Sequence, residues 1–399
     1  MMSLAGTDAS ETARDLAREV IIHGPISRSE LGRRLRLSPA SLTRLSKPFL
    51  ERGLFQESAE VPGGPGRPTR PLDVRVDAGR FVGVKVTGEA AVAVLTDFRA
   101  TALERAERPL ADHDVSTVVT TIAALVADLC GPDDGVAFVG VSVGGNVSDQ
   151  RVVTRAPFLD WRNVPLADLL EAELDLPVAV ENDVVALTTA EHWFGVVRGA
   201  PAFAVVTVGA GVGYGLVLHD RVISTVNSGL GLGGHLPLDP HGPLCLLGHR
   251  GCSTAMLSIP SIEAQVGMAL GRDVGYDDVL ELAGSGNAVA AAVTTAAGRA
   301  LGRMITMIAN IAMVDTIVLT GDGVALWDVV SDVAIAAMRD DRDPEATEIA
   351  VHVDTSGFDS WARGAAAIAI QNAVERGGLP TTSSAARAGR VTPAGAPVR

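Results

Sequence analysis

The feature that most constrains this fold is a series of short apolar runs, from Phe81 onwards, that end in glycine turns or acidic residues. "GVAFVGVSVGGNVS" (135–148) leads into two glycines, and "AFAVVTVGAGVGYGLVLHDRVI" (202–223) reads as a strand, a glycine-rich turn and another strand. "PVAVENDVVALTTAEHWFG" (177–195) reads as a short strand followed by a helix. Apolar strands with helices between them are typical of buried sheets. The pattern therefore predicts an α/β architecture.

Further elements follow the same alternation. Two β runs with a turn at Gly88-Glu89 are expected over 81–97, and a further strand over 316–321. Helical spacing predicts helices over 288–313 and 359–376. The last stretch, 378–399, is a low-complexity sequence, and we expect it to be a disordered tail.

The charge is distributed unevenly along the chain. Between Ile26 and Arg75, ten Arg or Lys residues stand against five acidic ones, a local net charge of +5, whereas the whole chain carries −14. The remainder therefore carries −19. A basic N-terminal module on an acidic body is typical of a DNA-binding head. A solvated charged face would give the same balance, so charge alone does not decide.

The N-terminal module has the helix order of a winged helix-turn-helix. A helix is expected over 10–23, Ser27 opens a capping box for a second helix, and Ser38 caps a third. Pro48 is expected to kink or shorten the third helix, which would make its C-terminal half a separate turn. A basic hairpin rich in Gly and Pro, "VPGGPGRPTRPLDVRV", follows as the wing.

In a winged helix-turn-helix the third helix enters the major groove, and the wing meets phosphates or the minor groove. We therefore expect double-stranded DNA as a partner, contacted by Ser38, Ser41, Thr43, Arg44, Lys47, Arg67 and Arg70. The alternative is a small helical protein-docking module, which the basic wing and the helix order disfavour.

The sequence indicates neither a membrane span nor a signal peptide. The longest apolar stretch, 304–321, contains Asn310 and Asp315, and the N-terminus lacks a basic start followed by an apolar block. Three cysteines, an odd and small number, argue against a disulfide framework. We therefore expect a cytoplasmic protein without a membrane partner.

Several motifs, in order and spacing, resemble the ROK family, which groups repressors with sugar kinases. The "END" at 181–183 lies in a segment similar to that family's entry to the substrate lobe. "TVGAGVGYG" resembles its second phosphate turn, and "GLGGHLPLDPHGPLCLLGHRGC" resembles its signature loop. The winged helix in front matches the repressor branch.

This resemblance implies a two-lobed actin-like ATPase (ribonuclease H-like) sugar-kinase fold, with a sugar cleft between the lobes and a homodimer or tetramer built from the bodies. We expect the DNA-binding domain over 10–76 and a first α/β lobe over 80–186, to which the helix 359–376 returns. A second α/β lobe over 187–358 would carry the signature loop and the oligomerisation surface.

The phosphate side of a kinase is incomplete. Family kinases begin with a D-x-G-G-T turn, but here Lys85 stands at the Asp, Thr87 at the first Gly and Glu89 at the Thr. Lys85 removes an acidic residue on the magnesium side of the site, and Thr87 adds a side chain where the backbone must come close to the phosphates. Glu89 brings negative charge towards them. The resemblance makes Asp183 the vestigial general base. We therefore expect no ATP binding and no kinase activity.

The sugar side is only partly intact. The resemblance implies ligand contacts from Gly144, Gly145, Asn182, Asp183 and His235. As an alternative, an Asp at a strand end often merely caps the following helix.

Two glutamates that accept hydrogen bonds from sugar hydroxyls in the family are replaced by Leu232 and Thr254. Leucine cannot accept a hydrogen bond, and threonine accepts only weakly. The effector is then a different, less polar or modified sugar, or the pocket is empty.

In relatives the signature loop holds zinc with one His and three Cys. Here His235, Cys245 and Cys252 match three of these ligands, and Leu247 replaces the fourth. His249 would restore a tetrahedral set, and His241 is a more distant candidate.

Two alternatives to a closed metal site remain open. Three protein ligands plus water would also bind zinc. Otherwise the loop packs around Leu246 and Leu247, with its apolar side inward, and holds no metal.

Together these features predict a transcription regulator, a repressor, in which a sugar-type ligand changes the angle between the lobes and so the spacing of two DNA heads. One alternative is a sugar kinase with a fused DNA-binding head. Another is a DNA-binding or scaffold protein that responds to no effector.

Overall fold

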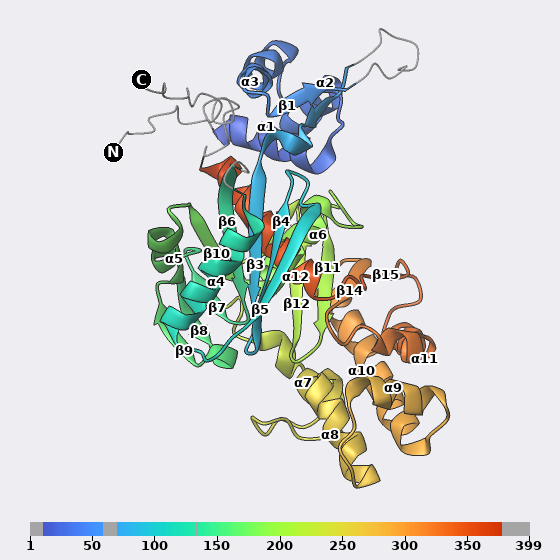
Figure 1. Ribbon diagram of the computed structural model, residues 1–399. Coiled ribbons are helices and arrows are strands. Elements are labelled where there is room, and N and C mark those ends of the chain that lie inside the picture. Colours follow the sequence, from blue (N-terminus) through green and yellow to red (C-terminus); the bar gives the residue numbers. More distant parts are fainter. Residues whose placement is uncertain (1–10, 59–69, 132–134, 377–399) are drawn as a thin grey trace, which may run out of the picture.

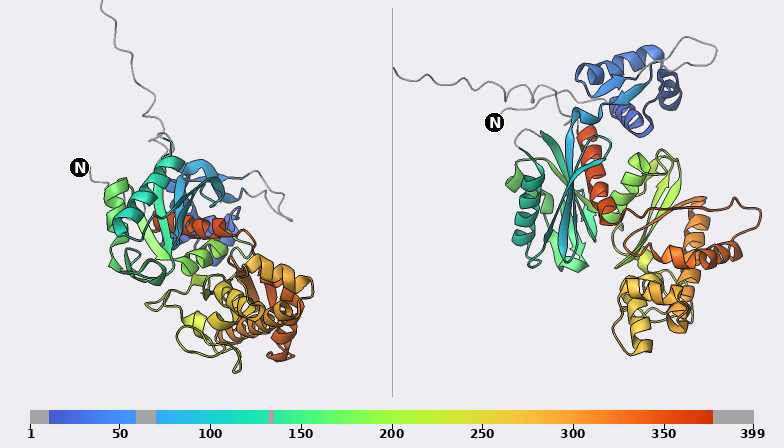
Figure 2. Two further views of the ribbon diagram at one scale, coloured as in Figure 1. Left: turned by 60° about the horizontal axis from the view of Figure 1, so that its bottom comes forward. Right: turned by 45° about the vertical axis from the view of Figure 1, so that its right-hand side comes forward.

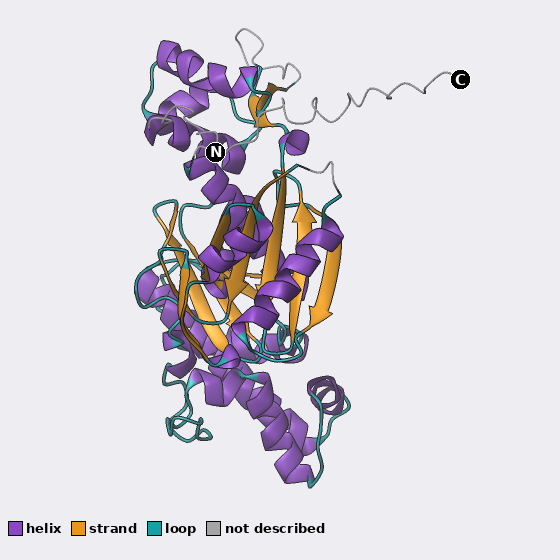
Figure 3. Ribbon diagram, turned by 60° about the vertical axis from the view of Figure 1, so that its left-hand side comes forward, coloured by secondary structure: helices purple, strands orange, loops and turns teal. Residues whose placement is uncertain are grey.

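The computed structural model describes residues 11–58, 70–131 and 135–376 (Figure 1). A mostly helical head lies at one end of the molecule, and the strands are concentrated in its middle (Figure 3). Within the described ranges no helix is long and apolar enough to cross a membrane. The tail that we expected over 378–399 lies outside the described residues.

The head contains three helices, α1 (Glu11–His23), α2 (Arg28–Leu35) and α3 (Pro39–Glu51), followed by the antiparallel pair β1 (Phe55–Glu57) and β2 (Leu72–Val74). The Ser27 side chain accepts a hydrogen bond from the Glu30 amide, and that of Ser38 from the Ser41 amide. This is the arrangement of a winged helix-turn-helix.

One expectation for the head was wrong, because Pro48 does not divide the third helix. α3 runs without interruption to Glu51. Pro48 lies in the last turn, so that only one helical hydrogen bond lacks its donor there. Ser46 and Phe49 are buried beside it, and their packing holds this turn in place.

The first of two large sheets has the order β10-β6-β3-β4-β5. Its strands are β3 (Arg80–Val86), β4 (Ala90–Thr96), β5 (Ala102–Pro109), β6 (Val136–Val143) and β10 (Val178–Asn182). β3, β6 and β10 are parallel, while β4 and β5 are added antiparallel. The helices α4 (Val115–Leu129) and α5 (Leu166–Leu174) pack beside it, as does a small antiparallel sheet of β7 (Asn146–Ser148), β8 (Val152–Ala156) and β9 (Trp161–Val164).

The C-terminal helix α12 (Phe358–Glu375) packs against this first sheet. Gly83 and Gly140 stand opposite each other on β3 and β6. A Cβ on either would overlap the α12 backbone, at Ala362 or Ala365 respectively. The two glycines therefore allow an alanine-rich helix to lie directly on the strands.

The second large sheet has the order β13-β12-β11-β14-β15. Its strands are β11 (Phe203–Val208), β12 (Val212–Leu218), β13 (Arg221–Val222), β14 (Thr316–Thr320) and β15 (Ala350–Val353). The helices of this part are α6 (Asp183–Phe194), α7 (Ser253–Leu257), α8 (Ile259–Leu270), α9 (Tyr276–Gly284), α10 (Ala288–Ala312) and α11 (Leu326–Asp340). α6 and α12 pack on each other between the two sheets (Figure 2).

The head is packed onto the body. One buried cluster contains Leu16 and Ile21 of α1, Phe81 of β3 and Ile368 of α12. α6 crosses the limit that we expected between residues 186 and 187, and the domain limits themselves stay predictions.

Candidate functional site

A cavity of about 780 Å³ lies between the two large sheets. It is lined by the β3–β4 turn, the β6–β7 turn, the start of α6, the β11–β12 turn and the segment before the loop at His235. All five residues that we expected to contact a ligand line it, namely Gly144, Gly145, Asn182, Asp183 and His235.

Asn182 ends β10 and caps α6. Its side-chain oxygen accepts hydrogen bonds from the amides of Val184 and Val185, both at 3.1 Å. Its side-chain nitrogen donates to the Gly145 carbonyl at 2.9 Å. Asn182 therefore joins two of the expected ligand-binding segments, and most of its hydrogen-bonding capacity is used within the protein.

Asp183 is paired with a buried cation. The Lys85 Nζ lies 2.5 Å from the Asp183 Oδ2 and 5.0 Å from the centre of the Trp361 ring. Lys85 is only 6% exposed. Asp183, the residue that we expected at the position of a vestigial base, therefore forms a buried ion pair with an ammonium group from β3.

Asp322 and Trp361 belong to this group, although the sequence analysis did not identify either. Burial raises the pKa of Asp322, and the Lys85 charge partly opposes this rise. Asp322 follows β14, and its carboxylate lies next to Gly209 of the glycine-rich β11–β12 turn. The glycine-rich "TGDG" after a buried strand was the available signal for Asp322, whereas Trp361, inside α12, gave none.

The β3–β4 turn hydrogen-bonds to itself. The Thr87 hydroxyl accepts from the amides of Glu89 and Ala90, at 3.2 and 3.0 Å. Glu89 is exposed and lines the cavity. Two amides that would otherwise be available to an anion are therefore bonded to a side chain, and the carboxylate of Glu89 lines the cavity at this turn.

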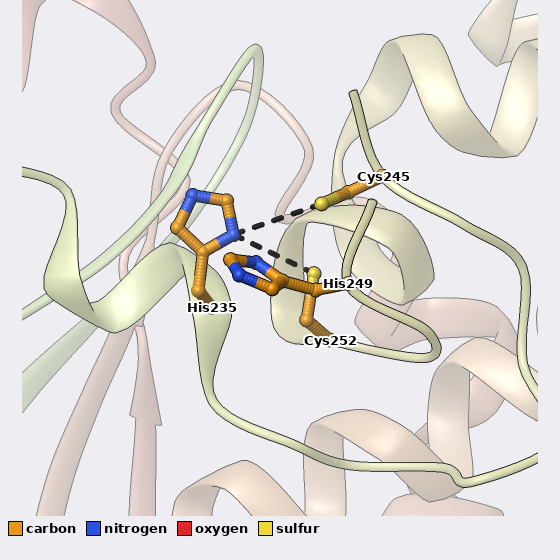
Figure 4. A group of neighbouring side chains, drawn as sticks. All are labelled: His235, Cys245, His249 and Cys252. Carbon is orange, nitrogen blue, oxygen red and sulfur yellow. Dashed lines mark hydrogen bonds between the residues drawn. The ribbon is translucent and has the colours of Figure 1, made fainter. Parts of the chain in front are cut away.

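The loop after the 3₁₀ turn Leu232–His235 brings four potential metal ligands together, His235, Cys245, His249 and Cys252 (Figure 4). Their ligand atoms all lie within 4.8 Å of one another. The His235 Nδ1 faces both sulfurs, at 3.9 Å from Cys245 and 3.6 Å from Cys252. Burial, and secondarily the charge of His249, lowers the pKa of His235.

A tight turn positions His249 beside Cys245. The Cys245 amide donates to the His249 carbonyl at 2.9 Å, and the Gly248 amide donates back to the Cys245 carbonyl. Leu246 and Leu247 lie at its tip, and Leu247 is 70% exposed. The alternative in which the loop packs around these two leucines is therefore wrong. His241 is not in the cluster.

The expected DNA-contacting residues of α3 are mostly exposed. Thr43, Arg44 and Lys47 face outward, and Lys47 lies 3.6 Å from Glu51 in an exposed pair. Ser38 and Ser41 bond to each other at the start of the helix. Arg70 lies 3.9 Å from Glu57 of β1, and Arg67 is outside the described residues.

Two arginines of the body hold the C-terminal end of α1. Arg99, between β4 and β5, donates to the carbonyls of Ile21 and Gly24. Arg198, four residues after α6, donates to the Gly24 carbonyl at 3.1 Å. Cations at a helix C-terminus satisfy its free carbonyls and complement its dipole. The end of α6 is thereby attached to the head.

Comparison with known proteins places these features in a family context. A profile described as "ROK family" matches residues 81–372. The DNA-binding transcriptional repressor Mlc of Escherichia coli K12 is 25% identical over 372 residues, which cover 89% of this chain and 91% of that protein.

Two solved structures share the fold. A ROK family transcriptional regulator, described as a homolog of E. coli MLC, superposes with a TM-score of 0.76 at 22% identity, covering 92% of this chain and 98% of that one. A ROK family glucokinase from Streptomyces griseus, in complex with glucose and AMPPNP, gives 0.64 at 25% identity, covering 73% and 100%. The α/β fold class predicted from the sequence is confirmed.

Proposed function

The chain belongs to the ROK family, and from that premise we propose that it is a DNA-binding transcription regulator, a repressor, that responds to a sugar-type ligand without phosphorylating it. The family contains both repressors and kinases, so the choice between them has to come from the site. Two features support a regulator. The first is a head of the DNA-binding type, and the second is the ion pair between Asp183, at the expected base position, and Lys85.

The head supplies the DNA-binding surface. Its third helix presents Thr43, Arg44 and Lys47 to solvent, a set that suits a mixture of base and phosphate contacts in the major groove. The E. coli relative named as a DNA-binding repressor is similar over 89% of this chain. A protein-docking module would not need a basic third helix.

The pairing of Lys85 with Asp183 is the main observation that supports a regulator over a kinase. A general base must accept a proton from the attacking hydroxyl. Asp183 is instead bonded to an ammonium group at 2.5 Å, which occupies one of its oxygens. Glu89, which lines the cavity at the β3–β4 turn, disfavours the phosphates of ATP.

Two assays separate the proposal from its rivals. Selection of binding sites from random duplex DNA should enrich a palindromic sequence, because a dimer presents two heads. A coupled assay of ADP release with a panel of hexoses should show no turnover. Turnover would favour a kinase with a fused head, whereas DNA binding that no sugar changes would favour an effector-independent protein.

We further propose that the signature loop binds zinc through His235, Cys245, His249 and Cys252. Tetrahedral zinc with sulfur and nitrogen ligands places neighbouring ligand atoms about 3.5–3.8 Å apart, and the distances of 3.9 and 3.6 Å from the His235 Nδ1 to the two sulfurs are close to this range. Zinc would stabilise the loop and fix the His235 ring at the cavity wall, leaving its other nitrogen for the ligand.

The metal proposal is tested on protein prepared without chelators. We expect one zinc per chain in the wild type and in Cys130→Ser, a cysteine away from the cluster, and a loss of zinc in Cys252→Ser. His249→Ala should also lose zinc if that residue is the fourth ligand. An absence of zinc in all four proteins would contradict the proposal.

A route for the ligand signal runs along α6. Asp183 begins this helix in the cavity, and Arg198, just beyond its other end, binds α1 of the head. A ligand that shifts the start of α6 would therefore move the attachment point of the head. In a homodimer or tetramer this would change the spacing of two heads, which a palindromic operator reads as affinity.

A further inference from the structure

We propose that the ligand of the cleft is a glycoside, a sugar ring that carries an apolar aglycone. This inference rests on the proposed function, since it specifies the effector of the same cavity. It derives from two observations: the limited hydrogen-bonding capacity of the polar side chains at the ligand end, and the exposed apolar side chains beside them.

The side chains that would bind sugar hydroxyls are largely occupied. The Asp183 Oδ1 accepts from the Asn182 side chain and the Val184 amide, and its Oδ2 accepts from Lys85. A carboxylate has about four acceptor sites, so roughly one remains. The Thr254 hydroxyl donates to the Gly234 carbonyl at 2.7 Å. Asp183 and Thr254 therefore supply few hydrogen bonds to a sugar, and a ligand that also gains affinity from apolar contacts is favoured over one that relies on these two side chains.

Large apolar side chains are exposed in the same cavity. Globular proteins rarely expose contiguous apolar surface unless it binds something. Leu232 is 60% exposed and Phe158 57% exposed, and three further residues are between 37% and 41% exposed. The five cavity-lining residues are Phe158, Tyr214, Ile223, Leu230 and Leu232.

Phe158 marks where a sugar ring would lie. An ideal Cβ on Gly144 would stand 3.3 Å from the Phe158 ring and 3.4 Å from the Asp183 Oδ2. The aromatic edge and the carboxylate therefore approach the same point. A pyranose there presents its apolar C–H face to the ring and one hydroxyl to the remaining acceptor of Asp183.

The aglycone would pack against Leu232 and Tyr214. A Cβ on Gly233 would come within 2.7 Å of the Tyr214 ring, so β12 and the turn that carries Leu232 are in close contact and form one surface. Leu232 stands where the resemblance places a glutamate, so its side chain makes this surface apolar. Exclusion of water from Leu232 would favour binding in proportion to the apolar area covered.

The size of the cavity allows a group larger than one sugar ring. Charged side chains of both signs line it, among them Glu89 and Arg155, and the Lys85 ammonium already has a carboxylate partner. The volume of about 780 Å³ is at the upper part of the range for small-molecule sites. The cavity therefore has room for an aglycone beside the sugar ring.

Calorimetry on the full-length protein tests the proposal with three matched probes. These are the free sugar, the methyl glycoside and the phenyl glycoside of glucose, galactose and mannose, in both anomers. We expect at least one phenyl glycoside to bind about tenfold or more tightly than its free sugar, the scale of a filled apolar pocket. Leu232→Glu should abolish this preference, and Leu169→Glu, an exposed leucine on α5, should keep it.

The outcomes separate this inference from the proposed function. Binding of the free sugars that equals or exceeds that of the phenyl glycosides overturns the glycoside proposal, as does no binding of any probe. DNA binding is measured on the same preparations, and its presence in those cases leaves the regulator intact. Loss of the phenyl preference in Leu169→Glu as well would also overturn the assignment to Leu232.

Discussion

The two ends of α6 differ in how well their buried polar groups are paired. At the cleft end, Asn182 caps the helix and Asp183 is bonded to Lys85. At the head end, the Glu191 Oε2 and the His192 Nε2 are buried without a hydrogen-bond partner within the described residues. Burial raises the pKa of Glu191 to about 7, and burial lowers the pKa of His192 to about 4.

This difference indicates which end of the helix is the more deformable. A fully bonded polar group resists displacement, whereas an unpaired one contributes little to holding its position. The cleft end is therefore fixed by its ion pair. The head end is held through backbone carbonyls: Arg363 of α12 donates to that of Phe194, while Arg99 and Arg198 donate to carbonyls at and just after the end of α1. We expect a displacement imposed at the cleft to be taken up at the head.

Lys85→Met tests the fixed end and has the largest expected effect. Removing one partner of a buried ion pair leaves an uncompensated charge, and we expect the unfolding free energy to fall by about 3 kcal/mol. Urea unfolding measures the loss. Lys47→Met, in an exposed pair, is the control and should cost less than about 0.5 kcal/mol. Similar losses in the two variants would mean that Asp183 is not held by Lys85.

His192→Gln tests the head end through pH. Because the folded-state pKa of His192 is about 4 and the unfolded value is 6.5, the unfolded chain binds more protons between these values. The contribution of His192 to the stability of the wild type should therefore fall as the pH drops from about 6.5 towards 4. The variant should lose about 2 kcal/mol less over this window.

Glu191 is present in both proteins, so its own titration cancels in this comparison. Its raised pKa has the opposite sign and favours the folded state at low pH. Parallel stability curves for wild type and His192→Gln would show that His192 is not held neutral by burial.

Arg198→Ala has the smallest expected effect, and it tests a single contact at the head end of α6. Loss of one charge-assisted bond to the Gly24 carbonyl should cost about 1 kcal/mol. Amide exchange at the end of α1 should become faster, while exchange in β3 and β10 stays unchanged. Arg221→Ala, at an exposed position of β13, is the matched control. Faster amide exchange at the cleft end instead would mean that the cleft end, and not the head end, is the more deformable one.

The sequence was most informative where a local pattern determines the structure. Ser27 and Ser38 cap their helices as predicted, because a cap needs only residues a few positions apart. The partner of Asp183 could not be foreseen in this way. Lys85 lies 98 positions away and meets it only after β3 and β10 join the same sheet.

The same reasoning explains the other differences. His249 was a candidate ligand by spacing, but only the turn that ends in Arg250 places it beside Cys245. Leu246 and Leu247 are apolar, and their exposure follows from their place at the tip of that turn. Trp361 lies beside Lys85 because two glycines admit α12 to the sheet, a contact across distant segments.

The central claim is that a basic head binds duplex DNA while the body senses a ligand. The most direct measurement is the affinity of the purified protein for a duplex selected from random DNA, as a function of salt. We expect binding that weakens by about 10³-fold or more between about 50 and 200 mM salt, with a salt dependence that is reduced by about one unit in Lys47→Ala. An absence of binding at low salt, or binding that salt does not weaken, would contradict the account.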